Sequence, residues 1–183
     1  MKTDLSKYNN SWYHPGGNPI KRLIWYFVNI LFFINPLNPL SSLKVALLRL
    51  FGAKIGSGVV IKPAVNIKYP WLLEVGDYTW IGERVWIDNL GMVKIGKNCC
   101  ISQGAMLLCG NHNYKKSTFD LIVLPITLEE GAWVGAMSIV CPGVTIKSHA
   151  ILTVDSVATE TLEGYTLYKG NPAVKIRDRK MND

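Results

Sequence analysis

The most constraining feature of this 183-residue chain is a hydrophobic pattern that repeats every six residues. In its clearest stretch, an aliphatic residue or alanine occupies every sixth position from Leu128 to Ala158, and the position four residues after each is equally restricted. An α-helix repeats every 3.6 residues and a strand every two, so neither explains a period of six. Short strands joined by regular corners do explain it, because each repeat then places one side chain in a common interior. The pattern predicts an all-β solenoid, a parallel β-helix of hexapeptide repeats.

Four blocks along the chain share this pattern, with two extra residues around 91–94 and a longer insertion at 113–125. Their repeat positions are Ile55, Ile61, Val75, Ile81, Ile87, Ile95, Ile101, Leu107, Leu128, Val134, Val140, Ile146, Leu152 and Ala158. We therefore expect one domain with three parts. These are an N-terminal extension with apolar helices (1–51), the β-helix with its inserted loop (52–168) and a short basic C-terminal segment (169–183).

Two apolar segments precede the repeats. Residues 23–34 are nearly all apolar but too few to span a bilayer, and a second apolar helix is expected over residues 41–51. The pattern favours helices that cover the open end or flank of the β-helix. A peripheral membrane contact through residues 20–34, with Lys21 and Arg22 at the lipid headgroups, is an alternative that is compatible with such a cap.

The formal net charge is +7, and basic residues gather near the C-terminus at Lys169, Lys175, Arg177, Arg179 and Lys180. Such a segment fits either a solvated tail or attraction to an anionic partner, such as a nucleotide pyrophosphate or a membrane surface. A nucleic-acid partner is not expected, because the chain shows no recognition helix, zinc finger or RNA-binding run.

The four cysteines point to a reducing compartment. None forms a CxxC motif, and Cys99 falls on an inward repeat position, which favours a buried free thiol. The first 17 residues are polar and irregular, unlike a secretory signal. We expect a cytoplasmic protein, with a peripheral position at the inner membrane face left open.

Of the three histidines, His112 is the candidate for chemistry. His14 lies in a Pro-Gly-Gly stretch and His149 at an outward corner of a repeat, whereas His112 stands where the coil breaks into its longest insertion. A loop that projects from a rigid solenoid is a common place for a catalytic group. Its imidazole can accept a proton near neutral pH from a hydroxyl or amine that attacks a thioester. An incidental loop histidine is the alternative.

The repeats, the Gly110-Asn111-His112 turn, the return over 120–126 and the ending Gly170-Asn171-Pro172-Ala173 together resemble the bacterial hexapeptide-repeat acyltransferases. The resemblance is closest to the colanic acid biosynthesis acetyltransferase type, is related to the maltose and galactoside O-acetyltransferases, and covers residues 51–177. It implies a left-handed β-helix, a homotrimer with active sites between subunits, acetyl-CoA as co-substrate and no metal. It also implies direct acetyl transfer to a sugar, or to an exopolysaccharide or lipopolysaccharide precursor, with His112 as general base.

Further site residues follow from the resemblance position by position. A polar residue, usually asparagine, helps to position the acceptor or the histidine, and here that position is Asp88, with Asn89 beside it. A carboxylate there would accept a hydrogen bond from the imidazole or from a sugar hydroxyl. Asn111 and Tyr114 are expected at the acceptor. The residues implied for acetyl-CoA are Trp133, Ala136, Val154, Thr159 and Arg177.

The chain departs from the family pattern over residues 153–160, where small glycines are replaced and Glu160 stands in place of the usual lysine. Lys147, Lys175 or Arg177 could supply the lost positive charge.

Two other enzyme activities are alternatives. One is N-acetylation of an amino sugar or antibiotic. The other is a zinc-dependent carbonic anhydrase, which is disfavoured because it needs three convergent histidines. A non-catalytic trimeric scaffold is the alternative outside enzymes.

Overall fold

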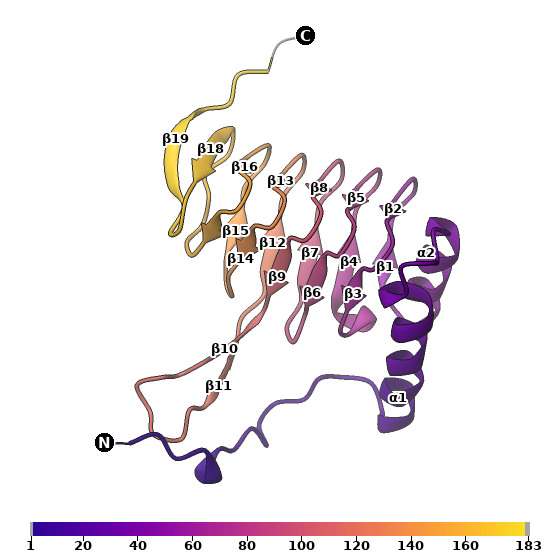
Figure 1. Ribbon diagram of the computed structural model, residues 1–183, viewed down its shortest axis with the longest axis vertical. Helices are drawn as coiled ribbons and strands as arrows, with labels where there is room; N and C mark the ends of the chain where they lie inside the picture. The colour runs from indigo at the N-terminus through magenta and orange to yellow at the C-terminus, as the bar shows by residue number, and fades with distance from the viewer. Residues whose placement is uncertain (1, 182–183) are drawn as a thin grey trace.

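The computed structural model describes residues 2–181 and shows a prism of stacked coils, with helices across one end and a hairpin projecting from the side (Figure 1). Residue 1 of the expected N-terminal extension and residues 182–183 of the expected basic segment lie outside the described residues. Three parallel sheets form the walls of the prism. The chain passes through each sheet once per coil, which confirms the predicted β-helix.

Sheet 1 contains five strands and sheet 3 another five, whereas sheet 2 has seven. Sheet 1 is formed by β1 (Lys54–Ile55), β4 (Leu73–Val75), β7 (Val93–Ile95), β12 (Ile126–Leu128) and β15 (Thr145–Ile146). Sheet 2 is formed by β2 (Val60–Ile61), β5 (Trp80–Ile81), β8 (Cys100–Ile101), β13 (Trp133–Val134), β16 (Ile151–Leu152), β18 (Thr166–Lys169) and β19 (Val174–Asp178). Sheet 3 is formed by β3 (Asn66–Ile67), β6 (Trp86–Asp88), β9 (Met106–Leu108), β14 (Ile139–Val140) and β17 (Val157–Ala158).

The core is a column of aliphatic side chains inside the prism. Leu107, Val140 and Ala158 occupy equivalent places in successive coils, paired through the parallel register of β9, β14 and β17. Every predicted repeat position is buried, because each repeat places the same side chain on the inner face of a wall. Burying a Leu or Ile side chain stabilises a fold by about 1.5–3 kcal/mol, so a regular stack of them accounts for the register.

Two helices cap the first coil. α1 (Pro19–Val28) continues into the π-helix η2 (Asn29–Ile34), and α2 (Ser41–Leu50) follows. Their side chains form hydrogen bonds to backbone carbonyls at the free edge of the coil. Trp25 Nε1 donates to the Ile67 carbonyl at 2.9 Å, and the buried Lys44 ammonium donates to the Lys62 carbonyl at 2.8 Å. Burial lowers the pKa of Lys44. An exposed strand edge would otherwise template unwanted pairing, so the cap completes the fold. Within residues 2–181, no helix has both the length and the apolar character needed to cross a membrane.

The insertion in the middle of the chain is more ordered than a loop. β10 (Gly110–His112) and β11 (Leu121–Val123) form an antiparallel hairpin that leaves the prism after sheet 3 and carries residues 113–120 at its tip (Figure 1). At the far end of the prism, β19 folds back antiparallel to β18, so much of the expected basic segment forms an edge strand.

Candidate active site

His112 is positioned by the hairpin. It is the last residue of β10 and pairs with Leu121 of β11, which holds its backbone in register. Its neighbour Asn111 is exposed, and the Asn111 side-chain oxygen accepts a hydrogen bond from the His112 amide at 2.8 Å. The imidazole is half-buried between the hairpin tip and the N-terminal segment.

A backbone carbonyl fixes the proton arrangement of this imidazole. His112 Nδ1 lies 2.9 Å from the Phe119 carbonyl oxygen. Because a carbonyl can only accept a hydrogen bond, Nδ1 must carry the hydrogen and donate it. The neutral ring is then left with Nε2 as its unprotonated nitrogen. A histidine held in this tautomer is prepared to accept a proton at Nε2.

Aromatic rings hold the same imidazole in place. The Phe119 ring stacks on it with centroids 4.4 Å apart and planes 8° from parallel, and Tyr8 approaches at 5.8 Å. Tyr8 belongs to the N-terminal segment, which bonds the hairpin tip through the Asp4 amide and the Ser117 carbonyl at 2.8 Å. The roles of Tyr8 and of the Phe119 carbonyl were not predicted, because no sequence motif marks a backbone acceptor or a contact across about a hundred residues.

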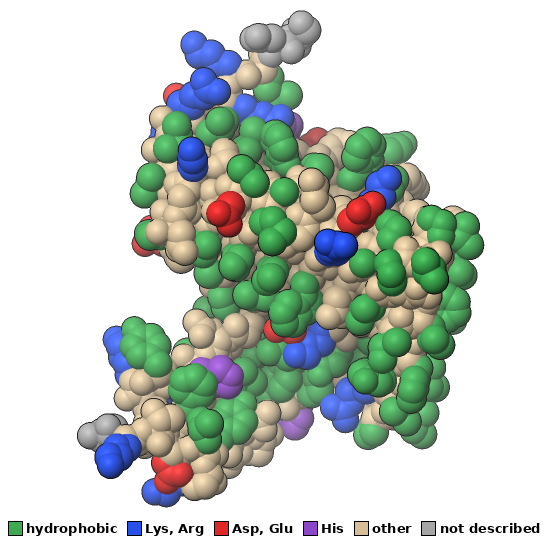
Figure 2. All heavy atoms as spheres, viewed as in Figure 1, with side chains coloured by type: hydrophobic (Ala, Val, Ile, Leu, Met, Phe, Trp, Pro, Cys, Tyr) green, Lys and Arg blue, Asp and Glu red, His purple; other side chains and the backbone are tan. Residues whose placement is uncertain are grey.

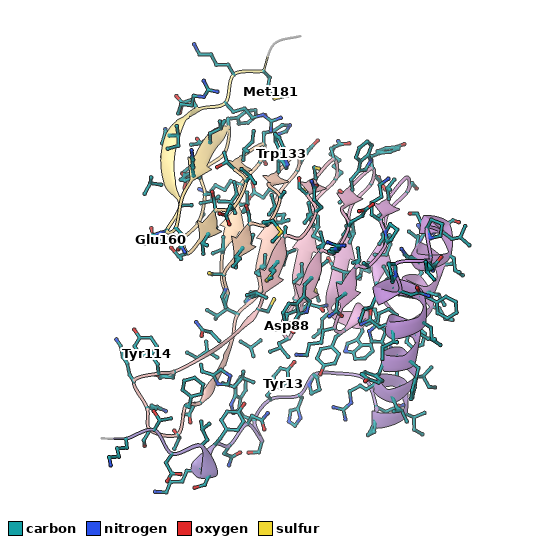
Figure 3. All side chains as sticks on the ribbon, viewed as in Figure 1. Tyr13, Asp88, Tyr114, Trp133, Glu160 and Met181 are labelled. Carbon is teal, nitrogen blue, oxygen red and sulfur yellow. The ribbon has the colours of Figure 1, made fainter. Side chains whose placement is uncertain are left out.

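Asp88 lies at the foot of the hairpin, at the end of β6 (Figure 3). Its Oδ2 comes within 4.0 Å of where a Cβ on Gly110 would stand, and its Oδ1 forms an ion pair with Lys68 Nζ at 2.9 Å. The structure does not pair Asp88 with the imidazole: the Phe119 carbonyl takes that place. The Tyr13 hydroxyl lies near this carboxylate and donates a hydrogen bond to the Leu90 carbonyl. The pKa of Tyr13 is raised, chiefly by burial and further by the nearby Tyr69, Asp88 and Cys109.

Asn89 makes its contacts inside the fold. The side chain is fully buried, its oxygen accepts from the Tyr69 amide at 2.9 Å, and its nitrogen donates to the carbonyls of Tyr69 and Leu72. Both hydrogens of the amide are therefore used to hold the turn at 69–72. We assign Asn89 a structural role and leave it out of the candidate acceptor residues.

Tyr114, unlike the buried Asn89, is exposed to solvent. It lies at the tip of the hairpin, far from Asp88, and its side chain is 78% exposed (Figure 3). Of the residues expected at the acceptor, the structure thus brings Asn111 and His112 together on β10, with Asp88 at its base. Tyr114 stands apart from them within one chain.

Three of the residues expected to bind the cofactor line one groove, here called the sheet-2 groove. It has a volume of about 480 Å³ and is lined by Trp133, Ala136 and Val154 together with Ser102, Gln103, Gly135, Ile151, Thr153 and Leu167. Trp133 is held across it by a hydrogen bond from its Nε1 to Ser102 Oγ at 2.9 Å. Short strands place outward residues of successive coils directly above one another, which explains how distant positions meet here.

The groove continues in both directions along sheet 2. A hollow of about 380 Å³ adjoins it at Ser102 and Gln103, and one of about 590 Å³ adjoins it at Ile151 and Leu167. The latter is also lined by Arg177, Arg179 and Lys180. One end of this surface is therefore strongly basic.

Arg177 is the free cation among the three considered as replacements for the missing lysine. Lys147 pairs with Glu163 and Lys175 with Asp178, both at 2.8 Å, and each carboxylate raises the pKa of its lysine. Within the described chain Arg177 has no such partner. Thr159 and Glu160 instead follow β17 on sheet 3 and do not line the groove.

The groove and the candidate base lie on different sides of one chain. Trp133, on β13 in sheet 2, lies on the side of the prism away from Asp88 and the hairpin (Figure 3). A recess separates the hairpin from the C-terminal strands in the space-filling view (Figure 2). His112 and the sheet-2 groove therefore do not meet within a single subunit.

Cys109, the cysteine nearest in sequence to His112, is buried. All four cysteines are free, and burial raises the pKa of Cys109 to about 11. A buried thiol of such high pKa is a poor nucleophile. Across residues 2–181, no group of three or more His, Cys, Asp or Glu side chains is arranged to hold a metal ion.

No family model matches the chain. It is 39% identical over 176 residues to the colanic acid biosynthesis acetyltransferase WcaF of Escherichia coli, a protein whose name is provisional, covering 96% of this chain and 97% of that protein.

Two solved structures share the fold. A hexapeptide-repeat acetyltransferase of Vibrio cholerae, complexed with acetyl coenzyme A, has a TM-score of 0.79 at 22% identity, over 88% of each chain. A galactoside acetyltransferase complexed with coenzyme A has a TM-score of 0.78 at 22% identity, over 88% of this chain and 82% of that one. These likenesses confirm the expected left-handed β-helix.

Proposed function

Because this chain belongs to the hexapeptide-repeat acyltransferases, we propose that it transfers an acetyl group from acetyl-CoA to a hydroxyl of a sugar, or of an exopolysaccharide or lipopolysaccharide precursor. His112 is the general base, and transfer is direct. The observation that carries the proposal is the hydrogen bond between His112 Nδ1 and the Phe119 carbonyl, which leaves Nε2 free to accept a proton.

The chemistry then needs no acyl-enzyme. Nε2 of His112 takes the proton of the acceptor hydroxyl as its oxygen forms a bond to the thioester carbonyl carbon. The carbon–sulfur bond breaks as the tetrahedral intermediate collapses, and the imidazolium returns the proton to the departing sulfur. The Phe119 carbonyl stabilises the transient imidazolium through Nδ1–H, as a carboxylate does in other triads. Asn111, beside the base, and Asp88, at the foot of the hairpin, are proposed to bind acceptor hydroxyls.

The sheet-2 groove suits an elongated thioester co-substrate. Its apolar wall of Trp133, Ala136 and Val154 fits the pantetheine arm, and the basic end at Arg177 fits phosphate groups. Of the residues carried over from the family, Thr159 lies outside the groove and does not strengthen this proposal.

A second subunit is needed to bring base and thioester together. The hairpin projects away from the prism, while the groove lies on another side of the same chain. We propose a homotrimer in which the hairpin of one subunit, including Tyr114 at its tip, reaches the sheet-2 groove of the next. A trimer closes three equivalent sites by rotation, which a linear arrangement does not.

We further propose that residues 52–168 form the catalytic unit, that 1–51 and 169–183 complete its two ends, and that the reaction takes place in the cytoplasm at the inner membrane face. Four free cysteines support a reducing compartment. The exposed apolar side of residues 20–34 supports peripheral contact.

The test combines binding with turnover. Calorimetry should show acetyl-CoA binding that weakens as salt rises, because Arg177 and its neighbours attract phosphate. In a paired screen of hydroxyl sugars and amino sugars, His112→Ala should lower kcat by about 10²–10⁴-fold with unchanged cofactor affinity. His14→Ala, a change at an exposed histidine outside the hairpin, is the control.

Each alternative has its own outcome. Transfer to amino sugars alone would establish an N-acetyltransferase with the same base. Absence of acetyl-CoA binding by a folded protein would favour the scaffold. Full turnover by His112→Ala would overturn the proposed mechanism while leaving the family assignment intact.

A further inference from the structure

The outward side of the cap remains apolar after the cap has made its contacts with the prism. α1 and η2 turn Trp25, Asn29 and Phe33 inward, where all three are buried. On the opposite side, the exposed residues recur at the 3–4 spacing of one helix face and are 39–70% exposed: Ile20, Leu23, Ile24, Phe27, Leu31 and Ile34. We name these six the cap stripe. A helix on a water-facing surface normally presents polar residues there.

The cap stripe is part of a larger uncharged surface. Residues 23–43 contain no charged side chain, and Leu37 and Leu40, just beyond the stripe, are 86% and 57% exposed. Figure 2 shows hydrophobic side chains gathered along the margin of the molecule formed by the cap helices. Exposed apolar surface of this extent marks an interaction site.

The sequence around the cap stripe is rich in basic residues and poor in acidic ones. Between Asp4 and Glu74 the sequence contains no Asp or Glu, while eight basic residues fall in the same interval: Lys7, Lys21, Arg22, Lys44, Arg49, Lys54, Lys62 and Lys68. In the fold, Lys7, Lys54 and Lys68 form ion pairs with acids outside this interval or at its ends, and Lys44 is buried, so the uncompensated charge lies mainly at Lys21 and Arg22. Lys21 and Arg22 begin the helix that carries the stripe, and within residues 2–181 neither forms an ion pair. The partner of this surface should therefore combine an apolar layer with negative charge.

A groove beside the stripe offers both chemistries at once. It has a volume of about 350 Å³ and is lined by Tyr26, Ile30 and Ile34 of the helix and by Arg22 and Lys68. Lys68 is paired with Asp88, so Arg22 is the cation available to a ligand. Acyl chains fit the helix side, and a headgroup phosphate fits Arg22, since its guanidinium can form paired hydrogen bonds to phosphate oxygens.

We propose that the cap stripe docks on a membrane surface containing anionic phospholipid. The stripe lies along the interface for about 12 Å over the eight α-helical steps from residue 20 to residue 28 and continues along η2 to Ile34, with its apolar side chains below the headgroups and Lys21 and Arg22 at the phosphates. This specifies the lipid partner of the proposed peripheral contact, and it does not depend on acetyl transfer.

The test is flotation of the full-length protein with vesicles of phosphatidylcholine, with and without phosphatidylglycerol. Wild type should float with the anionic vesicles, less so in high salt, and weakly with neutral vesicles. Phe27→Gln combined with Leu31→Gln should reduce vesicle affinity by at least about tenfold, because two large apolar contacts are lost. Arg22→Gln should weaken anionic binding by about fivefold and leave neutral binding unchanged.

The matched control is Ile176→Gln on β19 at the far end of the prism, where the side chain is 55% exposed, close to the 54% of Phe27. It should bind vesicles like wild type. Glycerol phosphate in solution should not displace the protein, since the proposal requires a lipid surface and not a free phosphate.

Three results would overturn the proposal: no flotation of wild type, equal flotation of the double variant, or a wild-type complex twice the mass of the double variant in sedimentation. The last would show that a second copy, cap against cap, covers the stripe. Calorimetry with acetyl-CoA on the same variants separates this outcome from failure of the enzymatic proposal, because the stripe and the sheet-2 groove share no residue.

Discussion

A single backbone oxygen decides what His112 can do. The side chain could be predicted as the candidate base, since it stands where the period of six breaks. Its tautomer could not, because the Phe119 carbonyl reaches it only through the hairpin register. The same limit applied to Asp88, whose position was predicted but whose partner, Lys68, comes from the previous coil.

Cysteine reactivity gives a prediction at this scale. Burial raises the pKa of Cys99 and of Cys109 from about 9 to about 11, whereas Cys100 is only half-buried and lines a hollow on sheet 2. Iodoacetamide at pH 8 should therefore alkylate Cys100 well before Cys99 and Cys109, as read by mass spectrometry. Cys109→Ala should retain turnover.

These raised pKa values also set the direction of a pH effect. The folded state holds the two thiol protons more tightly than the unfolded chain, so their contribution to stability is complete below about pH 9 and declines as pH rises towards 11. A Cys99→Ala variant should lose less stability than wild type over that pH window, as measured by chemical denaturation.

In the alkylation experiment, rapid modification of Cys109 in the native protein would contradict the burial assigned to this thiol.

At the scale of elements, the coils were predictable and the hairpin was not. Ile81 and Ile101 are register partners in adjacent strands because the same inward position recurs in each repeat. That recurrence can be read directly from a single sequence. The hairpin strands have no such alternation, since His112 and Leu121 meet on a projection without a core on either side. The continuation of α1 into a π-helix also left no sequence signal.

Corner geometry supplies a prediction for the coils. Gly131 adopts φ +68°, and a Cβ there would come within 2.7 Å of the His149 ring on the next coil. Gly131→Ala should therefore cost about 1–3 kcal/mol through backbone strain and overpacking. Thermal denaturation measures this loss, and His149→Ala in the same chain should restore part of it. No change in melting temperature would show that the corner relaxes.

At the scale of the whole molecule, the separation of base and groove predicts complementation. His112→Ala and Trp133→Asp subunits should each be inactive as homo-oligomers. If each site takes its base from one subunit and its groove from the next, every mixed trimer has one intact site of three, so the mixed species should recover about a third of wild-type activity. Co-expression with two affinity tags gives the mixed species for assay. Recovery near zero would place both residues of a site in one subunit.

The stacked coils also fix a height. Neighbouring strands of a sheet are about 4.8 Å apart, so the three steps from β2 to β13 place Trp133 about 14 Å along the prism axis from the capped end. With the cap on a lipid surface, only acceptors whose hydroxyl stands at that elevation above the bilayer can reach the thioester. The number of repeats would then select substrates by the distance between their lipid anchor and the reacting hydroxyl. Inserting one 18-residue coil, which is the spacing from Val134 to Leu152, would raise the preferred elevation by about 5 Å.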